Sequence, residues 1–222
     1  MKTNEQLQKD VQDAIKWEPL LNAAEIGVIA KDGVVTLSGV VDSYLKKVEA
    51  ENATKSVTGV KAVAEEIEVN YGNSFEKNDT EIATEVLNAW KNNWEIPNDK
   101  LKVQVENGLV TIDGEVGWNY QKDAAQKAVQ NLSGITWVTN NITVKSESKD
   151  AVEKSAVESA LARNWTLNDK DIHVKVSGNK VSLTGSVNSI YQKEEAGRLA
   201  WGAPGIWSVD NQLVVEYEYA FA

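Results

Sequence analysis

The sequence predicts an α+β fold class in which one small unit, with the order helix-strand-strand-helix-strand, is repeated three times in tandem. Two series of glycines indicate the repeat, because both step by 75 and then by 71 residues. The first series is Gly39, Gly114 and Gly185, and the second is Gly59, Gly134 and Gly205. The spacing of apolar residues inside each unit predicts which segments are helices and which are strands. We therefore expect three domains, over residues 1–72, 73–148 and 149–222, called repeats 1, 2 and 3 below.

The first element of each repeat is predicted to be a helix with one buried face. Its apolar residues recur at spacings of three and four, which places them on one side of a helix. They are Leu7, Val11, Ala14 and Ile15 in repeat 1, Ile82, Val86, Ala89 and Trp90 in repeat 2, and Val152, Ala156, Val157, Ala160 and Leu161 in repeat 3. Because Trp90 aligns with Ile15 and Leu161, we expect it to lie in the core of repeat 2.

Two strands joined by a tight turn are predicted to follow each opening helix. The turns fall at Asp32-Gly33, Asn107-Gly108 and Gly178-Asn179, residue types that tolerate the positive φ of a two-residue hairpin turn. Apolar residues alternate with outward-facing residues on both sides of the turn. The inward set is Ile26, Val28, Ala30, Val35 and Leu37 in repeat 1, Leu101, Val103, Val105, Val110 and Ile112 in repeat 2, and Ile172, Val174, Val176, Val181 and Leu183 in repeat 3.

A second helix and a last strand complete the predicted unit. Asp42 and Asn188 are suitable residues to cap the second helix, which buries Ala50, Ala125 and Ala196. The last strand is expected at 63–69, 138–144 and 209–215. We therefore expect each repeat to be a mini-sandwich, a three-stranded mixed sheet with both helices on one face. Glycine at the end of the second strand suits a sharp turn there, so the six glycines above are interpreted as structural residues.

Composition excludes several classes of function. The chain has 222 residues, no Cys, one His and a formal net charge of −10. Without Cys there is no disulfide, no Cys metal site and no thiol nucleophile. The charge and the lack of a basic stripe argue against binding of nucleic acid. No nucleophile, phosphate-binding or metal-ligand pattern is present, so we expect no enzymatic activity, no cofactor and no metal.

Targeting signals are the second kind of pattern that the sequence lacks. No run approaches the roughly 20 apolar residues of a membrane span. The N-terminus has no apolar stretch of a secretory signal. As written, the sequence therefore predicts a cytoplasmic protein without a transmembrane segment; the alternative is a periplasmic protein from which a leader has been removed.

Tryptophan is unusually frequent, with eight copies, and the repeats allow a comparison of their positions. Trp118, Trp201 and Trp207 each align with polar residues in both other repeats, so they are not expected in a deep core. We interpret these three as candidates for a partner or lipid surface, or for contacts between repeats. Trp94 and Trp165 align with each other and are expected to close a helix end.

The repeat unit resembles the BON domain, the module named after bacterial OsmY and nodulation proteins. The resemblance rests on the length near 70 residues, the αββαβ order, the glycine that closes the second strand, and the later glycine followed by an aliphatic residue. Those later pairs are Gly59-Val60, Gly134-Ile135 and Gly205-Ile206. The chain is thus similar to OsmY-like proteins, although it has three copies where two are typical.

Two readings of function follow from this resemblance. It implies a non-enzymatic protein of osmotic and envelope stress, whose domains contact phospholipid or a macromolecular partner. The alternative is a cytoplasmic protein that responds to a monovalent cation such as potassium. The sequence leaves the ligand, the oligomeric state, the relative orientation of the repeats and the equivalence of the three copies open.

Overall fold

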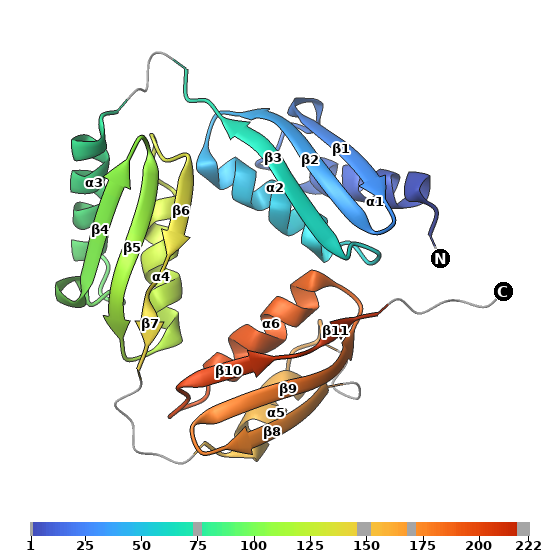
Figure 1. Ribbon diagram of the computed structural model, residues 1–222, viewed down its shortest axis with the longest axis vertical. Helices are drawn as coiled ribbons and strands as arrows, with labels where there is room; N and C mark the ends of the chain where they lie inside the picture. Colours follow the sequence, from blue (N-terminus) through green and yellow to red (C-terminus); the bar gives the residue numbers. More distant parts are fainter. Residues whose placement is uncertain (1, 73–76, 146–151, 168–171, 217–222) are drawn as a thin grey trace. The chain divides into compact units, whose positions relative to one another are not determined.

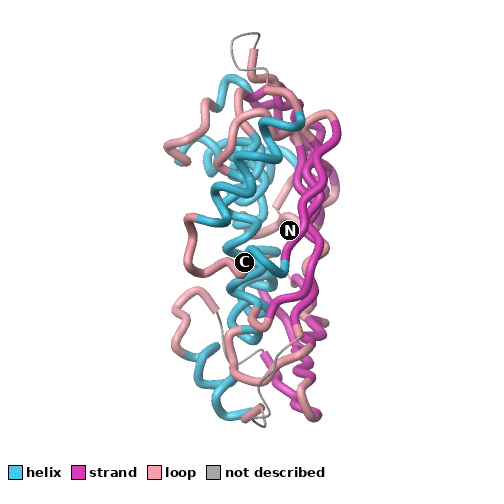
Figure 2. The backbone as a smooth tube through the Cα atoms, turned by 90° about the vertical axis from the view of Figure 1, so that its left-hand side faces the viewer, coloured by secondary structure: helices cyan, strands magenta, loops and turns pink. Residues whose placement is uncertain are grey.

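The computed structural model describes residues 2–72, 77–145, 152–167 and 172–216 of the chain (Figure 1). Each repeat has the predicted αββαβ order and forms a mixed sheet with its helices on one face (Figures 1 and 2). The predicted fold class is confirmed. By their internal contacts, the residues divide into two compact units, one of 1–38, 49–66 and 148–222 and the other of 39–48 and 67–147.

The elements have the following bounds. Repeat 1 contains α1 (Asn4–Trp17), the short 3₁₀ helix η1 (Ala23–Glu25), β1 (Ile26–Lys31), β2 (Val34–Val41), α2 (Tyr44–Ser56) and β3 (Ala62–Val69). Repeat 2 contains α3 (Asp79–Lys91), η2 (Asn98–Lys100), β4 (Leu101–Glu106), β5 (Leu109–Val116), α4 (Asn119–Gln130), β6 (Trp137–Asn140) and β7 (Thr143–Val144). Repeat 3 contains α5 (Lys154–Ala162), β8 (Ile172–Ser177), β9 (Lys180–Val187), α6 (Ile190–Trp201), β10 (Ser208–Asn211) and β11 (Val214–Val215).

The second strand of each repeat lies at the centre of its sheet. In repeat 2, β4 pairs antiparallel with β5, whereas β6 and β7 pair parallel with β5. Repeat 3 has the same arrangement around β9. The antiparallel pair turns at Asp32-Gly33 and Asn107-Gly108, where all four residues have positive φ. These two hairpin turns therefore have the predicted geometry.

Helix caps differ from the prediction by one residue. The N-cap of α6 is Ser189, whose hydroxyl accepts a hydrogen bond from the amide of Gln192 at 3.2 Å. In repeat 1 the hydroxyl of Ser43 accepts from the amide of Lys46, while the Asp42 carboxylate pairs with the Lys46 ammonium. The prediction of Asn188 and Asp42 as caps was wrong because the helices begin one residue later, at Ile190 and Tyr44, where serine is an equally good cap.

The last strand is continuous only in repeat 1. In repeats 2 and 3 it divides into β6 and β7 and into β10 and β11, with two residues outside the strands between them. Asn140 takes part in the interruption, because its side-chain oxygen accepts a hydrogen bond from the amide of Ile142 at 3.0 Å. Asn211 accepts in the same way from the amide of Leu213 at 3.3 Å. A side chain that bonds to the backbone two residues ahead competes with the strand ladder.

Each sheet covers its core on the helix side. The core of repeat 2 contains Trp90, which is completely buried, as predicted. The core of repeat 3 is a separate cluster that includes Leu161 and Leu183. In repeat 1 the buried residues include Val11 and Leu37. The alternating strand pattern and the helical spacing of apolar residues therefore lead to burial in all three repeats.

All six repeat glycines have positive φ, a conformation that favours glycine. Gly114 also lies close to other backbone atoms. A Cβ at this position would overlap the carbonyl oxygen of Lys100 and lie 2.9 Å from the Leu101 side chain. The end of β5 thus requires glycine for both conformation and space.

Candidate functional site

A nearly fully exposed tryptophan lies at the end of the opening helix or just beyond it in every repeat. Trp17 is the last residue of α1 and is 85% exposed. Trp94 and Trp165 each lie three residues beyond the end of α3 and α5, and they are 89% and 93% exposed. Tryptophan combines a large apolar ring with an N–H donor and is enriched at interfaces, so an indole exposed to this degree is available for contact with another surface. We call Trp17, Trp94 and Trp165 the turn tryptophans.

The turn of repeat 2 shows why its tryptophan faces solvent. The Asn93 side-chain oxygen accepts a hydrogen bond from the amide of Glu95 at 3.0 Å, and the Asn93 carbonyl accepts from the amide of Ile96 at 3.1 Å. Asparagine commonly forms turns of this kind. Ile96, at the end of the turn, is buried in the core. Trp94, one residue after the asparagine, is left to point outward.

Repeat 3 builds the same turn. The Asn164 side-chain oxygen accepts from the amide of Thr166 at 2.9 Å, and the Asn164 carbonyl accepts from the amide of Leu167 at 3.1 Å. Leu167 is buried as Ile96 is. Both turns therefore read Asn-Trp-x-Ile or Asn-Trp-x-Leu, with the last residue held by the core and the tryptophan free.

Repeat 1 exposes its tryptophan at an earlier position, at the end of the helix itself. Two more residues separate Trp17 from β1 than separate Trp94 from β4. The amide of Leu21 donates to the carbonyl of Glu18 at 3.0 Å, and Leu20 is half-exposed beside this turn. Trp17 therefore stands with a second apolar side chain on the surface of repeat 1.

The three tryptophans singled out from the sequence lie in different surroundings. Trp118 precedes α4 and is 38% exposed, and its ring centroid is 6.5 Å from that of Tyr120. Trp201 ends α6 and packs in part against the core of repeat 3. Trp207 is 54% exposed and precedes β10. These side chains are accessible to different degrees, and their role as contact residues stays a prediction.

A further aromatic contact lies within the second compact unit. The ring of Trp137 is 6.4 Å from that of Tyr44 in an edge-on arrangement, and the Lys47 ammonium lies 5.1 Å from the Trp137 ring centroid. Tyr44 is buried, and it packs with the core cluster of repeat 2. Sequence comparison gave no signal for Trp137 because its contact partners come from repeat 1.

The neighbouring carboxylates of Glu194 and Glu195 have separate partners. The Glu194 carboxylate lies 2.8 Å from the Lys55 ammonium. The Glu195 carboxylate pairs with the guanidinium of Arg198 at 2.6 Å and accepts from the Asn164 amide at 2.9 Å. Across the described ranges, no three His, Cys, Asp or Glu side chains gather in a way that could hold a metal ion. None of the helices within these ranges has the length and apolar character needed to cross a membrane.

The fold and the exposed indoles define a class of protein: a tandem array of small αββαβ domains that present aromatic side chains from their surfaces. The sequence profile of the BON domain matches residues 3–71, 78–146 and 149–217. The chain therefore belongs to the BON domain family and contains three BON domains.

Comparison with individual proteins agrees with this assignment. The chain is 27% identical over 129 residues to osmotically-inducible protein Y of Escherichia coli (strain K12). The match covers 56% of this chain and 64% of that protein, so the chain spans slightly less than two thirds of its relative.

Two solved structures of CdsD, a structural protein of the type III secretion system of Chlamydia trachomatis, are 18% identical to the chain. One match covers 93% of this chain and 90% of that one, and the other, to the C-terminal domain, covers 97% and 100%. Both have a TM-score of 0.26 and add nothing to the assignment.

Proposed function

We propose that this protein is a non-enzymatic, stress-associated binding protein whose BON domains contact phospholipid surfaces through the turn tryptophans. The single observation that carries the proposal is an indole, 85% or more exposed, near the end of the opening helix in all three repeats, two positions earlier in repeat 1 than in repeats 2 and 3. The similarity to an osmotically inducible protein supports the association with osmotic stress. A protein partner that recognises the same indoles is the competing reading.

Tryptophan suits the boundary between lipid and water. Its ring is largely apolar, its N–H group needs a hydrogen-bond partner, and the side chain is enriched at membrane interfaces for both reasons. The fold buries very little of each turn tryptophan, so nearly the whole ring is available for contact. Burial of one such ring gives weak binding, whereas three rings on one chain gain affinity through multivalency.

The charge of the chain determines what kind of membrane contact is possible. A net charge of −10 gives no long-range attraction to an anionic bilayer. Binding must therefore come from short-range contact of aromatic side chains with the head-group region. This favours a reversible surface association, without insertion of a helix.

Vesicle flotation with tryptophan variants tests the proposal. Replacement of all three turn tryptophans by serine should reduce the partition coefficient onto phosphatidylcholine vesicles by roughly tenfold or more, and each single change should reduce it less. Because these side chains are exposed, the far-ultraviolet circular dichroism and the unfolding midpoint should stay unchanged.

The matched comparison set consists of Trp118, Trp201 and Trp207, also replaced by serine. Loss of vesicle binding only in this second set would show that Trp118, Trp201 and Trp207 form the contact surface. Full vesicle binding by the variant that lacks all three turn tryptophans, or absence of binding by the unaltered protein, would contradict the proposal. In the second case, capture of a protein partner by the indoles becomes the explanation to pursue.

A further inference from the structure

Strand β1 lies at an edge of the repeat 1 sheet, in which the strand order is β1-β2-β3 (Figure 1). Its inward side chains are slightly more exposed than those at the centre of the sheet, since Val28 is 6% exposed whereas Val35 and Leu37 of β2 are fully buried. The alternate side chains face the open side of the sheet, where Ile29 is 63% exposed. An edge strand presents a row of backbone N–H and C=O groups with which another strand can pair. Strand β1 therefore offers both backbone groups and an apolar side chain to a partner.

The hairpin turn determines which backbone groups of β1 point away from the sheet. A turn of two residues, here Asp32-Gly33, makes the residues on either side of it a hydrogen-bonded pair, and such pairs alternate along the ladder. Lys31 and every second residue before it therefore bond to β2. The backbone groups that point outward belong to Ile26, Val28 and Ala30. Within the described ranges, no turn or loop segment forms a backbone hydrogen bond with these three residues.

The edge strands of the other two repeats carry polar or charged side chains at the positions that β1 leaves apolar. On the open side of the sheet, the residues are Lys102, Gln104 and Glu106 in β4 and His173, Lys175 and Ser177 in β8. The same positions of β1 hold Gly27, Ile29 and Lys31. Lysine within an edge strand commonly protects against pairing, because a partner strand would remove water from its charge. Repeat 1 lacks this protection before the last residue of the strand.

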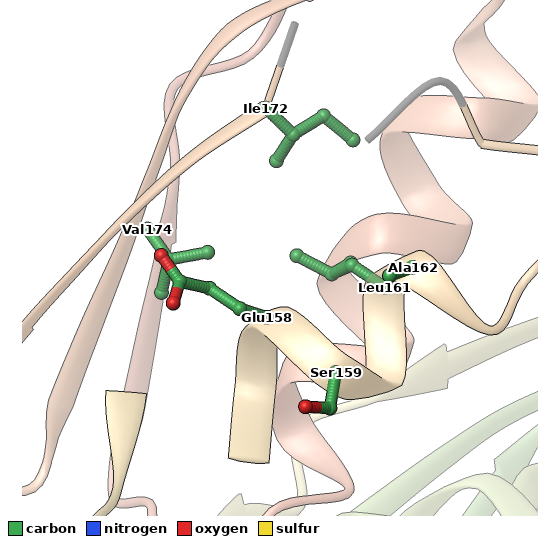
Figure 3. A pocket seen from close by; sticks show the side chains of 6 residues that line it. All are labelled: Glu158, Ser159, Leu161, Ala162, Ile172 and Val174. Atoms are coloured by element: carbon green, nitrogen blue, oxygen red, sulfur yellow. The ribbon is translucent and has the colours of Figure 1, made fainter. Parts of the chain in front are cut away.

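Helix α5 adds a further charge beside the edge strand of repeat 3. In Figure 3 the side chain of Glu158 reaches across to the side of Val174 in β8. In the alignment that places Ile15 opposite Leu161, the residue of α1 that corresponds to Glu158 is the uncharged Gln12. The edge at β1 therefore differs from the edge at β8 in its helix as well as in its strand.

We propose that β1 is a self-association surface, at which two copies of the chain pair their β1 strands antiparallel about a two-fold axis through Val28. This register places Val28 opposite its own copy and Ile26 opposite Ala30. All three are then in hydrogen-bonded pairs, so that their outward N–H and C=O groups find partners. A contact that uses the same patch on both copies closes after two copies. The result is one continuous sheet with the helices of both copies on the same face.

The side chains of β1 favour this register over its neighbours. Ile29 of one copy lies opposite Gly27 of the other, so a large side chain covers a position that has none. At the ends of the paired strands, Lys31 lies opposite Glu25, the exposed residue that precedes β1. Opposite charges placed across a strand pair stabilise it. A shift by two residues would place Ile29 opposite either Ile29 or Glu25 and would separate the opposite charges. Because β1 complements itself in this way, a second copy is the partner that fits.

Sedimentation equilibrium of the full-length protein over a range of concentrations tests the association. We expect a reversible monomer–dimer equilibrium that is micromolar or weaker, because two short strands bury less than the roughly 1,200 Å² of a stable interface. Ile29→Lys gives β1 the residue that repeat 3 has at this position, and it should weaken the association at least tenfold. Val40→Lys makes a similar change at an exposed position of the central strand β2 and should leave the dissociation constant unchanged.

Charge exchange tests the register. Glu25→Lys or Lys31→Glu alone places like charges opposite each other at both ends of the paired strands, and each should weaken the association several-fold at low salt. The double variant restores the opposite charges and should return the dissociation constant to within about twofold of the unaltered value. Recovery in the double variant excludes damage to the fold as the cause of the single effects.

The possible outcomes separate this contact from other surfaces. A chain that stays monomeric at its highest soluble concentration would overturn the proposal. So would a folded Ile29→Lys protein that associates as tightly as the unaltered chain, or a larger effect of Val40→Lys, which would place the contact on the open face of the sheet. Failure of the charge-exchanged double variant to recover would contradict the register about Val28. These measurements use no lipid, so their result is independent of the proposed membrane contact.

Discussion

The hydroxyl of Tyr71 joins two backbone segments of the second compact unit. It accepts a hydrogen bond from the amide of Tyr44 at 3.2 Å and donates one to the carbonyl oxygen of Ile135 at 2.8 Å. Burial raises the pKa of Tyr71 above its ordinary value, because the charged phenolate would lose its hydration. The neutral side chain is the form that holds these segments together.

Stability should therefore decrease at alkaline pH through Tyr71. The pKa of Tyr71 is higher in the folded state than the value of about 10 in the unfolded state. The stabilising contribution of the neutral side chain is therefore complete below about pH 10 and is lost as the pH rises through the folded-state pKa. Tyr71→Phe should be about 1 kcal/mol less stable at pH 7 and should lose less further stability above pH 10. Urea unfolding at pH 7 and above pH 10 measures this difference. Tyr191→Phe, at an exposed position, is the control; identical pH profiles for Tyr71→Phe and the unaltered protein would contradict the assignment.

The turn tryptophans show where sequence comparison fails at the scale of single residues. A gapless alignment places Trp17 opposite Asn92, because Trp17 lies two positions earlier in its repeat than Trp94 does. Trp94 and Trp165 were expected to close a helix, and the structure places both in an exposed turn. The pattern Asn-Trp followed two residues later by Ile or Leu was the available signal, since asparagine forms the turn and the aliphatic residue anchors it.

At the scale of elements, hydrophobic periodicity was sufficient for the two α-helices and for the first two strands of each repeat, but it did not predict the short 3₁₀ helices η1 and η2. It works because burial on one face is the main requirement that these segments share. It could not predict the interruption of the last strand, which depends on hydrogen bonds of Asn140. That side chain also donates to the carbonyl of Lys122 at 3.3 Å and to the side-chain oxygen of Gln126 at 3.0 Å.

Asn140 should consequently stabilise repeat 2 much more than its neighbour does. Asn140→Ala removes three hydrogen bonds in a half-buried site, and we expect a loss of about 1–3 kcal/mol. The amide of Ile142 should lose protection from hydrogen exchange, because its acceptor is gone. Asn141→Ala, which removes one exposed bond to Asp113, should change stability by less than about 0.5 kcal/mol. Equal effects of the two variants would show that the Asn140 bonds do not hold the break in the strand.

At the scale of the whole molecule, acidic residues exceed basic ones by ten, and none of the three repeats is basic. Charge therefore acts against any anionic partner. The turn tryptophans act at short range, where the surrounding salt concentration has little influence. The balance between these two effects predicts how membrane association depends on lipid and salt.

Partition onto phosphatidylcholine vesicles should be at least as strong as onto vesicles with added phosphatidylglycerol at low salt. An increase in salt to about 0.15 M shortens the screening length to about 8 Å and should strengthen binding to the anionic vesicles only. Flotation at two salt concentrations with both compositions measures this. Tighter binding to anionic vesicles that weakens with salt would instead require a local basic surface.

The turn that follows each opening helix has an evolutionary consequence. Its aliphatic anchor is constrained by the interior, whereas the neighbouring indole contributes almost nothing to folding. Under the proposed membrane contact, a mutation at Trp17, Trp94 or Trp165 changes binding and leaves folding almost unaffected. Duplication of such a domain would then give three contact positions that can diverge one at a time without a cost in stability.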